Sequence, residues 1–159
     1  MTPADFIHTM LAGALASQAA NQVPAGLSIA QAADETGWLK TTPPGNNLFG
    51  IKADAAWKGA VVMVPTHEVV HGVRVAVTCA FRAYPDFAAS IVDHGVFLRA
   101  NPRYAAAFSC TDSRAFARAM AAAGYATDPD YAQKICTIID AHQLQQYDLC
   151  SQPEQGSAP

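Results

Sequence analysis

The sequence predicts an α+β fold, in which a mainly helical body carries one small β-hairpin. Apolar residues recur with a helical period near both ends of the chain, whereas between residues 60 and 82 the period changes to two. The chain has 159 residues, 51% of them apolar, and alanine makes up a large share of these. This length and composition predict one compact domain over residues 1–150, followed by a disordered tail over 151–159.

Local signals place the helix ends. Ser28 and Gln31 form a capping-box pattern, so we expect the second helix to begin at Ser28 and to end near Gly37. Asp128 followed by Pro129 is typical of an acidic N-cap with proline at the first helical position, which predicts the start of the last helix. The remaining helices are expected over 4–18, over 86–100 and from about 113.

The middle of the chain predicts a β-hairpin. Residues 60–70 and 73–82 alternate in the way a strand requires, and His71-Gly72 between them suits a two-residue turn. The first strand contains His67-Glu68-Val69-Val70-His71, which matches the zinc-protease pattern H-E-x-x-H letter for letter. That chemistry needs a helix, because residues i and i+4 of a strand lie about 13 Å apart. We therefore expect no metal site, and no cofactor.

Charge and hydropathy exclude two classes of protein. Charged residues make up 14% of the chain and the net charge is −3, so no basic excess is available to neutralise phosphates, and a nucleic-acid partner is not expected. No apolar run approaches 18 residues, which argues against a membrane span. No Lys or Arg precedes the short apolar run near the N-terminus, so we interpret that segment as a helix and expect export without an N-terminal signal peptide.

The four cysteines lack the C-x-x-C spacing of zinc sites. Their even number permits two disulfides, which would indicate an oxidising compartment, but four free thiols in a reducing one are an equal alternative. One candidate pairing joins Cys110 with Cys150, and the other two cysteines are Cys79 and Cys136.

Glu35 is the first candidate for chemistry. It lies at the C-terminal end of an alanine-rich helix, where the helix dipole and the bulk of Trp38 disfavour the anion and raise the pKa. A carboxyl group with a raised pKa is suited to general acid catalysis near neutral pH. The alternative is a solvated glutamate at a helix end.

Several motifs follow one another over roughly residues 5–145. They are Ala30-Gln31-Ala32-Ala33-x-Glu35-Thr36-Gly37-Trp38, Asn46-Asn47-Leu48-Phe49-Gly50-Ile51-Lys52, Thr66-x-Glu68, Phe81-Arg82-Ala83-Tyr84 with Ser90-Ile91-x-Asp93-His94, and Gly124-Tyr125-Ala126-Thr127-Asp128-Pro129-x-Tyr131-Ala132. In order and spacing these motifs resemble the bacterial glucosaminidase family that includes the flagellar peptidoglycan hydrolase domain, glycoside hydrolase family 73.

The resemblance implies a lysozyme-like fold and hydrolysis of the β-1,4 bond between N-acetylglucosamine and N-acetylmuramic acid in peptidoglycan. By position, Glu35 would be the general acid, Glu68 on the hairpin the base, and Tyr125 a group that touches the sugar or the attacking water. For the aromatic candidates a role in the core is an equal alternative. The substrate-binding residues implied in the same way are Trp38, Asn47, Phe49, Tyr84 and Asp128.

Two positions depart from the family pattern. Asp34 stands where an aliphatic residue is usual, and it is either a surface residue or a like charge that raises the pKa of Glu35. Leu39 replaces a glycine, which can reshape the loop after the helix. We expect the carboxyl groups of Glu35 and Glu68 to lie more than about 9 Å apart without ligand, which permits inversion after lobe closure or assistance by the substrate's acetamido group.

Other readings stay open. A muramidase or lytic transglycosylase would also rely on one glutamate, and a non-catalytic peptidoglycan-binding module would keep the groove alone. A wall hydrolase that consists of a catalytic domain without an export signal suggests a toxin injected by a type VI secretion system into the periplasm of a target cell, or a phage endolysin. A domain trimmed from a larger protein is the third alternative. A toxin would require a periplasmic immunity protein, for which the simplest mode of action is to plug the active-site groove.

Overall fold

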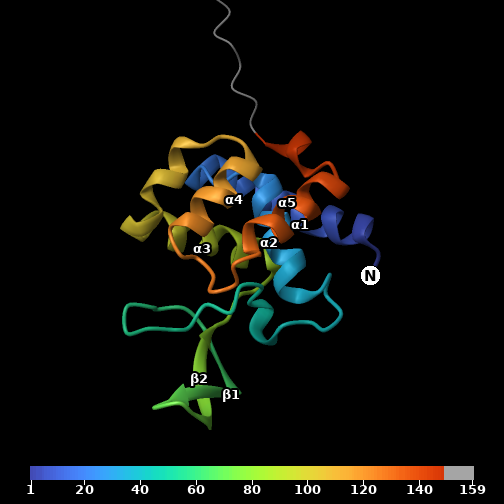
Figure 1. Cartoon of the computed structure of the whole chain (residues 1–159). Coiled ribbons are helices and arrows are strands. Elements are labelled where there is room, and N and C mark those ends of the chain that lie inside the picture. The colour runs from blue at the N-terminus through green and yellow to red at the C-terminus, as the bar shows by residue number, and fades with distance from the viewer. Residues whose placement is uncertain (149–159) are drawn as a thin grey trace, which may run out of the picture.

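The computed structural model describes residues 1–148, apart from the side chain of Val70. Helices form one body, and a two-stranded antiparallel sheet projects from it (Figure 1). This arrangement confirms the predicted α+β architecture; the tail predicted over 151–159 lies outside the described residues. The elements are α1 (Pro3–Asn21), α2 (Ala25–Thr36), η1 (Pro44–Asn46), β1 (Val61–Val70), β2 (Val73–Arg82), α3 (Phe87–Ala100), η2 (Pro102–Ser109), α4 (Ser113–Ala122), α5 (Tyr131–Ala141) and η3 (Leu144–Tyr147).

Helix α2 runs through the centre of the body. All of its residues from 25 to 33 are buried, and it packs against α1, α4, α5 and η3. Its alanines and glycine allow this close packing, because a Cβ atom at Gly26 would come within 2.6 Å of the Leu144 carbonyl oxygen. The last turn of α2, which carries Glu35, is therefore held on a rigid support.

The start of α2 corrects the sequence prediction. The helix begins at Ala25, and Ser28 is buried within it with a hydroxyl that has no partner among the described residues. The first N–H groups of the helix are satisfied from elsewhere in the chain: Ala25 N donates to Gln18 Oε1 at 2.8 Å, and Gly26 N donates to Asp148 Oδ1 at 3.0 Å. Because distant side chains cap the helix, the local capping box is not used.

The start of the last helix is also later than predicted. Helix α5 begins at Tyr131, and Asp128 precedes it in a turn. The Asp128 carboxylate accepts a hydrogen bond from the Asp130 N–H at 2.9 Å, and the Asp128 carbonyl accepts one from the Tyr131 N–H at 3.2 Å. The acidic residue thus closes a turn ahead of the helix instead of capping it.

The hairpin agrees with the predicted strand ranges and turn. Strands β1 and β2 pair from Val61 opposite Arg82 to Val70 opposite Val73. His71 and Gly72 form the turn with φ angles of 50° and 80°, the left-handed pair that suits a tight hairpin. The H-E-x-x-H pattern therefore lies on a strand and its turn. No group of three or more His, Cys, Asp or Glu within the described residues is placed to hold a metal ion.

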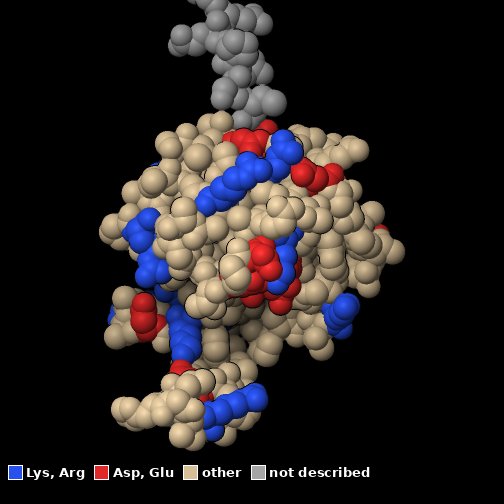
Figure 2. Space-filling model, viewed as in Figure 1, with Lys and Arg blue, Asp and Glu red and all other residues tan. Residues whose placement is uncertain are grey.

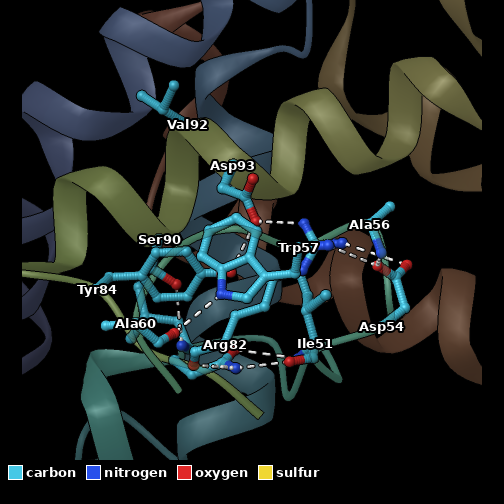
Figure 3. A network of polar contacts seen from close by, with 12 residues as sticks. Ile51, Asp54, Ala56, Trp57, Ala60, Arg82, Tyr84, Ser90, Val92 and Asp93 are labelled. Atoms are coloured by element: carbon cyan, nitrogen blue, oxygen red, sulfur yellow. Dashed lines mark hydrogen bonds and ion pairs between the residues drawn. The ribbon is translucent and has the colours of Figure 1, made fainter.

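The base of the hairpin is tied to α3 by one carboxylate. Asp93 Oδ2 accepts a hydrogen bond from Arg82 Nη1 at 2.8 Å and another from the Tyr84 hydroxyl at 2.7 Å (Figure 3). The Trp57 ring covers the Arg82 guanidinium, whose Cζ lies 4.6 Å from the ring centroid. Beyond this junction the hairpin extends into solvent, and Met63 and Val69 keep 59% and 73% of their surface exposed.

Helix α3 is placed by close contact with α1. A Cβ atom at Gly95 would come within 2.3 Å of Ser17 Oγ, and one at Gly13 would come within 2.6 Å of the Ala88 Cα. These two glycines let the helix backbones approach and fix the rotation of α3 about its axis. Asp93 and His94 on α3 consequently face the hairpin junction and the interior, respectively.

None of the helices within residues 1–148 combines the length and apolar character needed to span a bilayer. On the face shown in Figure 2, Lys and Arg side chains are interspersed with Asp and Glu, and no extended basic surface is present.

We expect Asp93→Asn to lower the free energy of unfolding by about 1.5–3 kcal/mol, because hydrogen bonds to charged groups contribute about this much. The Arg82 and Asp93 side chains are only 13% and 18% exposed, so loss of the charge leaves a poorly solvated guanidinium. The measurement is urea unfolding followed by circular dichroism. Asp140→Asn is the control: its ion pair with Arg114 is exposed and contributes about 0–1 kcal/mol. Equal losses for the two variants would contradict the anchoring role.

Candidate active site

Glu35 occupies the last turn of α2, which ends at Gly37 in a left-handed C-cap. The side chain reaches solvent, but the surrounding protein partly buries the carboxyl group. This burial is the main cause that raises the pKa of Glu35, and the negative charge of Asp34 raises that pKa further. Asp34 therefore is both exposed and a like charge beside Glu35, so the two interpretations of this position are both correct.

Three successive residues after α2 adopt left-handed backbone angles. Gly37, Trp38 and Leu39 have φ values of 55°, 64° and 55°. Such angles cost an L-residue other than glycine about 1–2 kcal/mol. The Leu39 N–H donates to Thr36 Oγ1 at 3.1 Å, and the Leu39 side chain packs against the core, so the structure supports the strained conformation at this departure from the family pattern.

Tyr125 carries a neutral hydroxyl group on the segment between α4 and α5. Burial raises the pKa of Tyr125 well above its ordinary value, and the charges of Tyr131 and Glu35 raise it further. The Tyr125 ring is packed between Tyr104 and Tyr131, with centroid distances of 5.8 and 5.3 Å.

A cleft of about 350 Å³ opens beside Tyr125, between α3 and the base of the hairpin. Phe49 forms part of its wall and stacks on His94, with 3.9 Å between the ring centroids and 12° between the planes. The cleft is lined by Phe49, Gly50, Ile51, Lys52, Asp54, Arg82, His94, Phe97 and Tyr125.

Glu68 belongs to the hairpin and has the opposite electrostatic setting to Glu35. Its Oε1 accepts a hydrogen bond from Lys52 Nζ at 2.5 Å and a weaker one from Cys79 Sγ at 3.6 Å. The hydrogen bond and charge of Lys52 lower the pKa of Glu68, with a smaller contribution from Cys79. Glu68 therefore loses its proton more readily than an ordinary glutamate, whereas Glu35 keeps its proton more readily than one.

Two of the predicted substrate-binding residues have their polar groups engaged by the protein. Asn47 is 5% exposed, and its amide makes three hydrogen bonds, donating to the Ile51 and Arg82 carbonyls and accepting from the Ile51 N–H. Tyr84 is 7% exposed and donates its hydroxyl proton to Asp93. These contacts hold the loop and the hairpin base in place.

Trp38 and Asp128 lie apart from the cleft lining. The Trp38 ring packs edge-on against Phe6 and His142 of the helical body, at centroid distances of 5.3 and 4.7 Å. The Asp128 carboxylate pairs with Lys134 Nζ at 2.5 Å, and this hydrogen bond lowers the pKa of Asp128. Among the predicted substrate-binding residues, the structure brings Phe49 into the cleft beside Tyr125.

Lys52 and His94 also belong to the site, although no local pattern singled them out for it. Their place inside the quoted motifs was the available signal. The hydrogen bond between His94 and Tyr125 joins residues that lie 31 positions apart, and such a contact leaves no local pattern in the sequence.

Within residues 1–148 Cys79, Cys110 and Cys136 are free thiols, which agrees with the free-thiol alternative for these three residues and not with the disulfide alternative. Cys150, the other half of the predicted pairing with Cys110, lies outside the described residues.

The arrangement has the parts of a glycoside hydrolase site. It combines a carboxyl group with a raised pKa, a carboxylate with a lowered pKa and a neutral tyrosine near an aromatic-walled cleft. The model of the glucosaminidase family, described as mannosyl-glycoprotein endo-beta-N-acetylglucosaminidase, matches residues 12–144. The chain belongs to this family.

Relatives agree with the assignment. The peptidoglycan hydrolase FlgJ of Salmonella typhimurium is 37% identical over 141 residues, which cover 85% of this chain and 45% of FlgJ. The exo-glucosaminidase LytG of Bacillus subtilis is 36% identical over 129 residues, which cover 77% of this chain and 45% of LytG. The chain thus spans less than half the length of these relatives.

Solved structures confirm the fold of the family. The glycoside hydrolase domain of Salmonella typhimurium FlgJ superposes with a TM-score of 0.79 at 34% identity, over 92% of this chain and 91% of that domain. The catalytic domain of the autolysin Auto from Listeria monocytogenes gives a TM-score of 0.81 at 27% identity, over 92% of this chain and 87% of that domain.

We expect Asp34→Asn to lower the pKa of Glu35 while leaving it above its ordinary value, because burial is the larger of the two causes. The measurement is a titration of the Glu35 carboxyl carbon by 13C NMR, which does not depend on activity. Asp34→Glu keeps the charge and serves as the control, with a small change expected. An unchanged Glu35 pKa in Asp34→Asn would show that Asp34 does not act on the site.

Proposed function

We propose that this protein is a peptidoglycan N-acetylglucosaminidase that cleaves the β-1,4 bond between N-acetylglucosamine and N-acetylmuramic acid. The observation that carries the proposal is the difference between two carboxyl environments. Glu35 is partly buried beside Asp34, which raises its pKa, whereas Glu68 accepts a hydrogen bond from Lys52, which lowers its pKa. Groups whose surroundings push their pKa values apart are suited to act as acid and base in one reaction. The names of the relatives, peptidoglycan hydrolase and exo-glucosaminidase, support the substrate and the bond.

In this proposal Glu35 protonates the glycosidic oxygen of the leaving sugar. Glu68 remains a carboxylate and orients the water that attacks the anomeric carbon, while Tyr125 hydrogen-bonds the sugar. A separation of about 6.5–9.5 Å between the carboxyl groups suits inversion, and a wider gap suits closure of the hairpin or attack by the substrate's own acetamido oxygen. Lys52 contributes by keeping Glu68 charged.

A wall hydrolase acts where its polymer lies, so the proposed site of action is the periplasm or the cell exterior. The finer proposal is an antibacterial effector delivered into the periplasm of a target cell, with a phage endolysin as the alternative route. An immunity protein would act by filling the cleft of about 350 Å³ beside Tyr125. The three free thiols give no support for a disulfide within residues 1–148, so the effector proposal is argued from the wall chemistry.

We expect the purified protein to release fragments from peptidoglycan that end in N-acetylglucosaminitol after borohydride reduction, as read by mass spectrometry. Glu35→Gln should lower the rate by about 10²–10⁴-fold, the usual contribution of a general acid. Muramitol or anhydromuramic ends would assign the protein to the muramidases or lytic transglycosylases. Intact glycan with wall binding would indicate a binding module.

The melting temperature of Glu35→Gln tests whether a loss of activity in this variant reflects unfolding. The pKa of Glu35 is higher in the folded state than in the unfolded chain, so this group favours folding at low pH, and its contribution is lost as the pH rises through the folded pKa. Glu35→Gln should therefore melt no lower than the wild-type protein at pH 7. A large fall in its melting temperature would show that lost activity reflects unfolding.

We expect Lys52→Met to move the acidic limb of the pH–rate profile to higher pH. Without the ammonium group the pKa of Glu68 rises, and a base works only when deprotonated. Lys58→Met is the matched control, because Lys58 Nζ donates to the Ala55 carbonyl and not to a carboxylate. Superimposable profiles for Lys52→Met and the wild-type protein would argue against Glu68 as the base.

A further inference from the structure

We propose that His94 is a positioning residue that turns the Tyr125 hydroxyl into a hydrogen-bond donor toward the bound glycan. In this arrangement the neutral His94 ring donates its Nε2–H to the Tyr125 oxygen. The Tyr125 proton is then free to point into the cleft, toward an acceptor oxygen of the sugar. The identity of the ligand rests on the proposed function, but the tautomer of the His94 ring does not.

The geometry holds the two side chains in one relation. His94 Nε2 lies 3.0 Å from the Tyr125 oxygen, a hydrogen-bond distance. The His94 ring is 1% exposed and stacks nearly parallel on Phe49, while Gly95 beside it packs closely against Ser17 of α1. The two rings are thus held by their neighbours, His94 by Phe49 and Tyr125 by Tyr104 and Tyr131.

The other ring nitrogen decides which group donates. His94 Nδ1 is buried and has no hydrogen-bond partner among the described residues. If Nδ1 carried the hydrogen, an N–H group would be buried without an acceptor, at a cost of about 1–3 kcal/mol. If Nε2 carries it, the ring's donor is satisfied by Tyr125 and only a lone pair on Nδ1 remains unpaired, and unpaired acceptors are better tolerated in folded proteins than unpaired N–H groups.

The state of the ring is stable over the working range of pH. Burial lowers the pKa of His94 to about 3, so the ring stays neutral in weakly acidic and neutral solution. Tyr125 stays protonated because burial raises its pKa. Between two neutral groups one hydrogen bond forms, and its direction determines whether the tyrosine offers a proton or a lone pair to the substrate.

One consequence for the substrate follows. A hydroxyl proton aimed into the cleft selects an acceptor, such as the carbonyl oxygen of an acetamido group, over a donor such as a sugar hydroxyl proton. His94 acts on the reaction only through Tyr125, so its contribution disappears when the tyrosine hydroxyl is absent.

The first measurement is a long-range 1H–15N NMR spectrum of the histidine rings, recorded from pH 5 to 8. The chain has five histidines, and the His94 signal is identified by its loss in His94→Gln. We expect a neutral Nε2–H tautomer that does not titrate over this range. An Nδ1–H tautomer, or titration near pH 6.5, would overturn the proposal whatever the enzyme's activity.

The second measurement is a double-mutant cycle on peptidoglycan hydrolysis. We expect His94→Phe, which keeps the stack on Phe49, to lower kcat by about tenfold in the wild-type background, the effect of one lost hydrogen bond. In a Tyr125→Phe background, His94→Phe should have little further effect on kcat. In the wild-type background, His94→Gln can still donate a hydrogen bond to Tyr125, so its kcat should lie above that of His94→Phe. Equal losses in both backgrounds would indicate a packing role and overturn the proposal.

Controls separate this test from that of the proposed function. His8→Phe alters an exposed histidine on α1 and should leave the rate unchanged. If the wild-type protein releases no fragments with glucosaminitol ends, the proposed function fails. The double-mutant cycle is then measured on the release of the muramitol or anhydromuramic ends that the protein forms instead. The NMR result stands in either case, because it is read without substrate.

Discussion

The active-site architecture depends on one carboxylate. Asp93 joins α3 to Arg82 and Tyr84 at the base of the hairpin, so the position of Glu68 relative to the helical body is set through this junction. The junction is polar but poorly solvated, which makes it directional: the guanidinium and the phenol each reach the same oxygen of Asp93. An apolar contact of the same area would hold the hairpin without fixing its angle.

His94, the residue after Asp93 on α3, contacts Tyr125 on the other side of the site. Because Gly13 and Gly95 allow α1 and α3 to approach closely, the rotation of α3 is fixed, and with it the directions of Asp93 and His94. One helix thus orients the hairpin on one side and the Tyr125 hydroxyl on the other. The acid on α2 depends on neither, because its helix is buried along residues 25–33.

Local patterns were sufficient for the elements whose causes are local. The alternation and the His71-Gly72 turn predicted the hairpin, and the end of α2 at Gly37 followed from the left-handed preference of glycine. The pattern at Ser28 failed because Gln18, seven residues before the helix, and Asp148, near the other end of the described chain, cap the helix instead. Motif positions drew attention to Glu35, but no linear pattern shows that the Asn47 amide is hydrogen-bonded to backbone groups, or that Lys52 reaches Glu68.

The two halves of the site differ in how firmly the fold holds them. Local opening requires little energy where few apolar groups are buried and backbone hydrogen bonds face water, which describes the outer hairpin, with Met63 and Val69 mostly exposed. Glu35 stands on the most deeply buried helix, so amide exchange should be slowest just before it and fastest around Glu68. Warming would then disorder the strand that carries Glu68 before the helix that carries Glu35, so the two carboxyl groups would lose their relative placement while the helices, and the circular dichroism, were still intact.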